Sequence, residues 1–142
     1  MHGSDIAKWW MVVGGGLMVV IGGLALLDSN LVGTRPDAVL TANATHGAVH
    51  LAGGLLSIGA GLMLAGRARA NAALLYGAIF MMGFFLNLMS ADLWGHMSVA
   101  SNKADHVVHF TFALASLAAG YVARYETSTR PLYAGPPAPR AS

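Results

Sequence analysis

Two short segments carry histidine and carboxylate side chains at a spacing that brings them to one face of a helix. In "TANATHGAVHLAGG" His46 and His50 lie four residues apart. In "SNKADHVVHFTF" Asp105 and His109 have the same spacing, and His106 lies beside them. Residues four apart are neighbours on a helix surface. Both segments run directly into apolar residues, where ionisable groups usually have a partner or a function.

Several chemistries suit this set of side chains. A thiol-free, histidine-rich cluster with a carboxylate is a typical ligand set for Zn, Cu, Fe or Ni. Two histidines from facing helices are also an axial pair for haem, and a single histidine can ligate the magnesium of a chlorophyll-type pigment. The same groups can instead be purely structural, capping helices and forming hydrogen bonds across a bundle. The candidate ligands are His46, His50, Asp105, His106 and His109.

The composition indicates that these segments belong to a membrane protein. Of the 142 residues, 56% are hydrophobic and only 10% are charged, against about 25% charged residues in soluble domains. Four stretches lack Asp, Glu, Lys and Arg, and each approaches or exceeds the ~20 residues that a helix needs to cross a bilayer. They are residues 9–27, 38–66, 70–91 and 106–123. Because a spanning segment must satisfy its own backbone, we expect an all-α bundle of four transmembrane helices.

The net charge, the lack of cysteine and the lack of catalytic motifs exclude several classes of function. The net charge of +2 and the lack of a clustered basic face argue against nucleic acid as a partner. The absence of cysteine excludes disulfides, thiolate catalysis and thiolate metal ligands. No nucleophile elbow, phosphate-binding loop or zinc-protease helix motif occurs, so the sequence offers no catalytic constellation.

The basic residues predict an orientation, because Lys and Arg are enriched in cytoplasmic loops. The expected spans leave most of them on one side of the membrane and two on the other. We therefore expect a multi-pass protein of the bacterial inner (cytoplasmic) membrane with both termini cytoplasmic and both histidine segments at the outer face. The first group is Lys8, Arg67, Arg69, Arg124, Arg130 and Arg140, and the second is Arg35 and Lys103.

An internal repeat relates the two polar segments. Aligning His50 with His109 also pairs Asn43 with Asn102 and His46 with Asp105. Both asparagines suit helix N-caps. The repeat predicts two copies of one helical hairpin that point the same way, related by an axis along the membrane normal. The histidines, one turn below the caps, should then meet across the bundle.

Small residues follow the histidines on the same helix faces. Such ridges let helices approach closely in lipid, so we expect these positions to form helix contacts. They are Gly53, Ser57, Gly61 and Ala65 in the second span, and Ser116 and Gly120 in the fourth.

These motifs resemble a family of small four-helix bacterial membrane proteins known as domain of unknown function 4383. The resemblance covers roughly residues 8–125. It is carried by an Asn-x-x-His-x-x-x-His start to the second helix and an Asn-x-x-Asp-x-x-x-His start to the fourth. In this chain His106 stands where the family more usually has Asn, which favours the metal or pigment interpretation. The resemblance implies the topology and these positions, and brings no established activity.

The end of the chain differs in composition. We expect a four-helix transmembrane domain over residues 1–125 and a Pro-rich cytoplasmic tail over residues 126–142. Within the tail, a short extended segment is typical of a strap that crosses a partner. It consists of Arg130, Pro131, Leu132 and Tyr133.

The sequence favours one function and leaves two alternatives open. The favoured function is a non-catalytic accessory or scaffolding subunit of a larger bacterial membrane complex, of respiratory or photosynthetic type, with a His-ligated metal, haem or pigment near the outer face. The first alternative is a stand-alone metal- or haem-dependent membrane enzyme. The second is a self-associating structural membrane protein. The bilayer and other membrane subunits are the expected partners.

Overall fold

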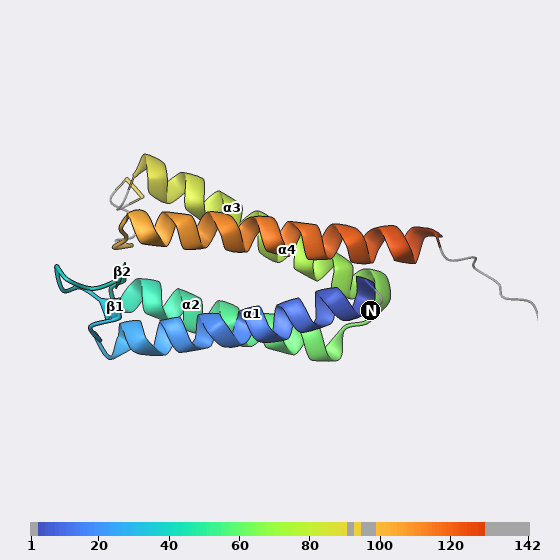
Figure 1. The fold of residues 1–142 in the computed structure, drawn as a ribbon, viewed down its shortest axis with the longest axis horizontal. Helices are drawn as coiled ribbons and strands as arrows, with labels where there is room; N and C mark the ends of the chain where they lie inside the picture. Colours follow the sequence, from blue (N-terminus) through green and yellow to red (C-terminus); the bar gives the residue numbers. More distant parts are fainter. Residues whose placement is uncertain (1–2, 91–92, 95–98, 130–142) are drawn as a thin grey trace, which may run out of the picture.

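The described part of the chain is built from four long helices. The computed structural model describes residues 3–90, 93–94 and 99–129. Each helix is long and apolar enough to cross a membrane, which confirms the prediction of four such helices (Figure 1). The helices are α1 Gly3–Leu26, α2 Ala44–Met63, α3 Gly66–Met89 and α4 Lys103–Thr129.

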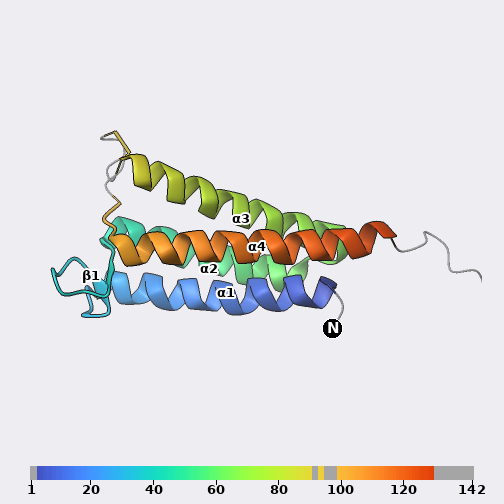
Figure 2. The ribbon, with the colours of Figure 1, turned by 45° about the horizontal axis from the view of Figure 1, so that its top comes forward.

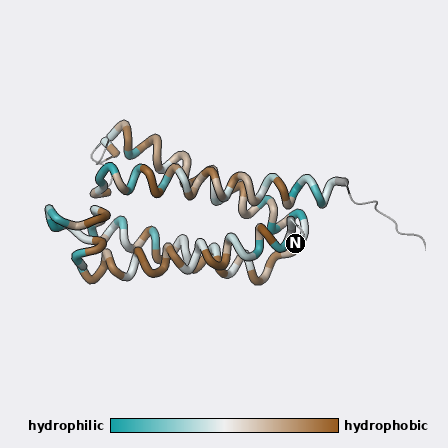
Figure 3. Tube along the Cα trace, viewed as in Figure 1, coloured by the Kyte–Doolittle hydropathy of each residue, from teal (hydrophilic) through white to brown (hydrophobic). Residues whose placement is uncertain are grey.

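The helices run alternately up and down, so the bundle has two distinct ends. The α1–α2 and α3–α4 connections lie at one end, which we call the histidine end because His46 and His109 lie near it. The α2–α3 connection and the start of α1 lie at the other, which we call the arginine end because Arg67 and Arg124 lie near it. Figure 3 shows hydrophilic residues concentrated toward the two ends and in the α1–α2 connection.

Helix boundaries differ from the charge-free stretches in a consistent way. At the arginine end the helices include Lys8, Arg67 and Arg124, because a long basic side chain can reach water while its backbone stays helical. α4 continues to Thr129, beyond the expected domain boundary at residue 125. In the second stretch, by contrast, residues 38–43 precede the helix and belong to an extended connection.

The α1–α2 pair is held by glycines that bring the two backbones into contact. A Cβ atom added at Gly15 would lie 2.7 Å from the Gly54 carbonyl oxygen, and one at Gly22 would lie 2.6 Å from that of Gly47. The contacting glycines are seven residues apart on each helix, which keeps them on one face. A side chain at these positions would force the helices apart.

The α3–α4 pair uses the same kind of contact between the middle of the helices and the arginine end. A Cβ atom at Gly77 would lie 3.0 Å from the Ala113 carbonyl oxygen, and one at Gly120 would lie 3.0 Å from that of Ala70. α1 and α4 join the two pairs (Figure 2). Trp10 Nε1 donates a 2.8 Å hydrogen bond to Ser116 Oγ in that contact.

Most large apolar side chains point out of the bundle. Leu17, Leu55, Leu75 and Leu114 are all about half exposed or more, whereas the buried core consists largely of alanine and methionine. A water-soluble protein would bury such leucines. In a bilayer the acyl chains cover them, so close packing of small residues is what holds the helices together.

The α1–α2 connection is ordered by a small set of hydrogen bonds. Strands β1 (Val32–Gly33) and β2 (Leu40–Thr41) form a short parallel ladder. Asp28 Oδ1 accepts hydrogen bonds from the Thr34 backbone N–H at 2.6 Å and the Thr34 hydroxyl at 3.0 Å. These two donors hold the pKa of the Asp28 carboxyl below its ordinary value.

Candidate metal centre

The two polar segments begin helices by the same capping chemistry. Asn43 Oδ1 accepts a 3.0 Å hydrogen bond from the His46 N–H at the start of α2. At the start of α4, Asn102 Oδ1 accepts from the Asp105 N–H at 3.0 Å, and Asp105 Oδ2 accepts from the Asn102 N–H at 2.7 Å. This reciprocal pair is a capping box. The caps fix where each helix starts, and so fix the height of His50 and His109 one turn further on.

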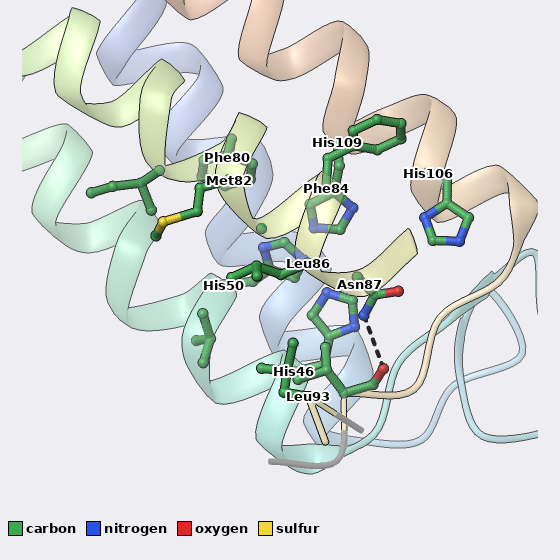
Figure 4. Close-up of a pocket in the computed structure, with 14 residues that line it drawn as sticks. His46, His50, Phe80, Met82, Phe84, Leu86, Asn87, Leu93, His106 and His109 are labelled. Atoms are coloured by element: carbon green, nitrogen blue, oxygen red, sulfur yellow. Dashed lines mark hydrogen bonds between the residues drawn. The ribbon is translucent and has the colours of Figure 1, made fainter. Parts of the chain in front are cut away.

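Three histidines converge at the histidine end of the bundle. The ring centroids of His46 and His50 lie 4.5 Å apart, and those of His109 lie 5.4 Å and 5.2 Å from them. One nitrogen from each ring lies within 4.8 Å of the other two (Figure 4). His46 and His50 are only 3% and 6% exposed. We call this set the histidine triad.

The triad bridges helices whose backbones stay apart. Among the described residues, no Cα atom of α2 lies within 8 Å of one in α4. The imidazoles of His50 and His109 nevertheless meet, because each extends from its helix toward the space between them. The side chains, rather than direct helix packing, therefore connect α2 with α4.

Backbone carbonyls fix two of the three rings. The ring Nδ1 atoms of His46 and His109 each lie 2.8 Å from a carbonyl oxygen, of Ala100 and Asp105 respectively. A carbonyl only accepts, so each Nδ1 carries the proton and donates it. In the neutral ring the Nε2 lone pair is then free. Metal-ligating histidines are held in this way, with the other ring nitrogen donating to a carbonyl or carboxylate.

His50 is the ring without such an anchor. Its Nδ1 atom is buried and has no hydrogen-bond partner among the described residues. The Phe80 ring stacks beside both His50 and His109, at 6.0 Å and 5.7 Å between centroids. A buried polar nitrogen without a partner is costly, so a bound ligand at this position would remove an unfavourable feature of the site.

Two of the five candidate ligands lie outside the triad. Asp105 is buried, but its Oδ2 atom accepts from the backbone N–H groups of Asn102 and Thr41, at 2.7 Å and 2.9 Å. The carboxylate therefore caps α4 and ties it to β2. The His106 ring lies edge-on to Phe84, with centroids 6.0 Å apart. Neither group joins the three nitrogens that converge.

The small residues divide between close contacts and open positions. Ser57 and Ser116 are fully buried, and the Ser57 hydroxyl donates to the Met11 carbonyl at 2.9 Å. Gly61 and Gly120 lie at close helix contacts, as expected for packing positions. Gly53 and Ala65 do not: a Cβ atom at Gly53 would meet only the Tyr76 hydroxyl at 3.6 Å, and Ala65 is exposed beyond the end of α2.

Sequence reasoning missed several residues around the triad. Residues 99–101 cross the histidine end and form hydrogen bonds with both α2 and α3. The Ala100 carbonyl accepts from His46 of α2. Asn87 of α3 donates to the Val99 carbonyl and accepts from the Ser101 hydroxyl. Their contacts depend on the path of the connection, and no local pattern predicts that path. The contact of Phe80 with the triad, by contrast, follows from the place of this residue on the inner face of α3.

The expected partner strap, Arg130, Pro131, Leu132 and Tyr133, lies outside the described residues. The accessory-subunit role that depends on it stays a prediction.

The chain matches no protein-family model, no curated protein and no solved structure. The resemblance to the domain of unknown function 4383 family therefore rests on the two polar motifs alone, and the geometry of the histidine triad carries the functional argument.

Proposed function

We propose that this chain is an integral membrane protein that binds one divalent transition-metal ion through His46, His50 and His109. The single observation that carries the proposal is the convergence of three ring nitrogens, one from each residue, within 4.8 Å of one another. Three neutral imidazoles are a ligand set for Zn²⁺ that leaves a fourth coordination position for an external ligand. At that position the ion would polarise a bound oxygen.

The distances support an ion with short bonds to nitrogen. Three nitrogens at the usual zinc bond length of about 2.0–2.1 Å in a tetrahedral site lie about 3.3 Å apart. The present separations are up to 4.8 Å, so the three rings would have to draw together by about 1.5 Å around such an ion. The two carbonyl anchors on His46 and His109 already select the tautomer that presents Nε2.

The same geometry argues against haem between these rings. Axial histidines of a haem lie on opposite faces of the macrocycle, so the macrocycle must pass between them. All three rings of the triad lie within 4.5–5.4 Å of one another, centroid to centroid, and Phe80 lies beside two of them. A planar macrocycle would have to displace at least one histidine and the phenylalanine.

The proposal includes the two-hairpin repeat and the orientation. Similar glycine contacts support the repeat: Gly54 aligns with Ala113 when His50 is aligned with His109, and each of the two contacts a glycine of the preceding helix, Gly15 and Gly77 respectively. The arginine end carries more basic residues than the histidine end, which supports a cytoplasmic arginine end. The triad then lies on the outer side of the inner membrane.

Metal analysis of the purified full chain tests the proposal. The protein is reconstituted in lipid nanodiscs, incubated with Zn²⁺ or Co²⁺, and freed of loosely bound ions. We expect one ion per chain, and a Co²⁺ absorption spectrum of tetrahedral type. His50→Ala and His109→Ala should lose the ion. His106→Ala is the matched control, because His106 lies on the same helix turn as His109 but outside the triad, and it should retain it.

Two results would contradict the proposal. One is a wild-type chain that is folded in nanodiscs yet retains no stoichiometric ion. The other is equal loss of the ion in His106→Ala and His109→Ala, which would show that retention of the metal does not depend on the triad in particular.

A further inference from the structure

A cavity of about 210 Å³ extends from the histidine triad into the space between α2 and α3. All three triad residues line it, together with Asn87 at the histidine end (Figure 4). Apart from His106, its other walls are apolar, formed by aliphatic and aromatic side chains such as Val49, Ile79, Phe80, Met82, Phe84 and Leu86. We call it the wedge pocket. It places a polar, metal-binding cluster at one side of an otherwise apolar chamber.

The pocket opens sideways, through the face of the bundle between α2 and α3. Val49 on α2 and Ile79 and Met82 on α3 line the pocket and are each about half exposed, at 54%, 49% and 57%. All three lie within helices long enough to cross the membrane. The face between them therefore meets acyl chains rather than water.

Access from the histidine end is restricted by the chain itself. Asn87 donates to the Val99 carbonyl at 3.2 Å and also bonds Ser101, while His46 bonds the Ala100 carbonyl. These bonds fasten residues 99–101 to α2 and α3 on both sides of the triad. Among the described residues, the exposed side of the pocket is the face between α2 and α3.

The pocket has a structural cause in the second hairpin. In the first hairpin, Gly22 and Gly47 let α1 and α2 touch at the histidine end. In the second hairpin His106 is the residue that aligns with Gly47, and Phe84 follows Gly77 by seven residues, as Gly22 follows Gly15. The rings of Phe84 and His106 pack edge to face. Two rings in place of two glycines keep these helices apart, and Figure 2 shows α3 running away from the other helices toward this end.

We infer that the wedge pocket binds a single-chain amphiphile from the membrane, with an oxygen-donor head at the metal and its apolar chain between α2 and α3. This inference rests on the proposed metal site and names the class of its fourth ligand. The volume favours one chain, because sites for drug-sized molecules measure about 300–1,000 Å³ and this pocket is smaller. The buried, unpartnered His50 Nδ1 atom marks the polar side of the chamber.

Hydroxamic acids of different chain length test the inference, since their two oxygens bind transition metals. Full-length protein in nanodiscs is loaded with Co²⁺ and titrated with acetohydroxamate or decanohydroxamate, with the Co²⁺ spectrum as the readout. In Gly83→Leu we expect decanohydroxamate to bind about tenfold more weakly than in the wild type, as for a misfit in an apolar pocket. Acetohydroxamate should be unaffected.

The variant has a matched control. Gly83 lines the pocket, and a Cβ atom there meets nothing within 4 Å, so a leucine can enter the empty space. Gly59 on α2 is equally open but does not line the pocket. Gly59→Leu should leave both affinities unchanged. Val49→Phe, which narrows the opposite wall, should repeat the effect of Gly83→Leu if that variant is poorly folded.

The outcomes separate this inference from the proposed function. If no Co²⁺ spectrum appears in the wild type, the proposed metal site is contradicted, and the inference about its fourth ligand is contradicted as well. If Co²⁺ binds but Gly83→Leu and Val49→Phe change the affinities for the long and the short probe equally, or change neither, the metal site stands and the membrane amphiphile is excluded. A water-soluble fourth ligand would then replace it.

Discussion

The imidazoles of His50 and His109 lie in contact, with ring centroids 5.2 Å apart, although the Cα atoms of their helices stay more than 8 Å apart. Side chains alone therefore connect α2 and α4 at the histidine end. In the proposed site a metal ion would join the two hairpins at a place where glycine packing does not reach. Metal binding and the stability of the bundle should accordingly be coupled.

Added Zn²⁺ should raise the thermal stability of the wild-type chain. A ligand that binds only the folded state stabilises it by about 2.7 kcal/mol at a concentration of 100 times its Kd. The midpoint of unfolding, followed by circular dichroism in nanodiscs, should rise with Zn²⁺ in the wild type and in His106→Ala. It should not move in His109→Ala. A rise of the same size in all three proteins would indicate binding elsewhere.

Asp105→Asn should weaken the fold and leave the metal site occupied. The Asp105 carboxylate accepts from two backbone N–H groups, those of Asn102 and Thr41, and a hydrogen bond to a charged group contributes about 1.5–3 kcal/mol. The amide keeps one acceptor oxygen but loses the charge, so we expect a loss of about 1 kcal/mol in the free energy of unfolding. Denaturant titration measures this loss, and metal analysis measures occupancy.

The opposite pattern would assign Asp105 a different role. Loss of the ion with unchanged stability would make the carboxylate a ligand rather than a cap. Asp105→Ala provides the stronger perturbation, because it leaves both N–H groups without this acceptor.

Gly54→Ala should destabilise the first hairpin. The added Cβ atom would lie 2.5 Å from the Gly15 carbonyl oxygen and 2.8 Å from the Val19 backbone nitrogen. Backbone atoms cannot move aside as a side chain would, and overpacking typically costs about 1–3 kcal/mol. Gly59→Ala, on the same helix with nothing within 4 Å, should be neutral or slightly stabilising. Unfolding in mixed micelles compares the two, and equal effects would contradict the glycine contact.

The amino-acid sequence predicts the helices well, because the bilayer fixes their length and the absence of charge marks them. It also places the starts of α2 and α4 accurately. The Asn43 and Asn102 side chains accept hydrogen bonds from backbone N–H groups three residues later in the chain. Capping is a local interaction, so a few consecutive residues are enough to predict it.

The contacts between helices were harder to predict, because they depend on two segments at once. A ridge with steps of four along α2 predicts contacts at Gly53, Ser57, Gly61 and Ala65. Ser57 and Gly61 do pack against α1, but the closest backbone contacts are made by Gly47 and Gly54, seven residues apart. Gly15 and Gly22 on α1 have the same seven-residue spacing, and this match identifies which glycines of α2 make the contact. Because α1 and α2 are antiparallel, the match is found only when the two sequences are compared in opposite directions.

Acid should loosen the α1–α2 connection at Asp28. The Thr34 backbone and hydroxyl donors hold the pKa of this carboxyl below its ordinary value of 3.8. A lowered pKa means that the ionised form is favoured in the fold, so its contribution is complete above 3.8 and is lost as the pH falls through the lowered pKa. The Thr34 amide resonance, followed by NMR during acid titration in micelles, should shift in that window. Asp28→Asn should abolish the shift, and its persistence would contradict the assignment.

Cysteine labelling should place the histidine end outside the cytoplasm. The natural chain has no cysteine, so a single introduced thiol reports one position. Asp37 is exposed in the α1–α2 connection, and Ala68 is exposed in the first turn of α3. A membrane-impermeant maleimide should label Asp37→Cys in intact cells and Ala68→Cys only after the membrane is opened, because basic residues favour the cytoplasmic side. Labelling of both in opened membranes controls for access. The reverse pattern would put the triad on the cytoplasmic side, so that the ion would have to be taken from the cytoplasm rather than from the outer compartment.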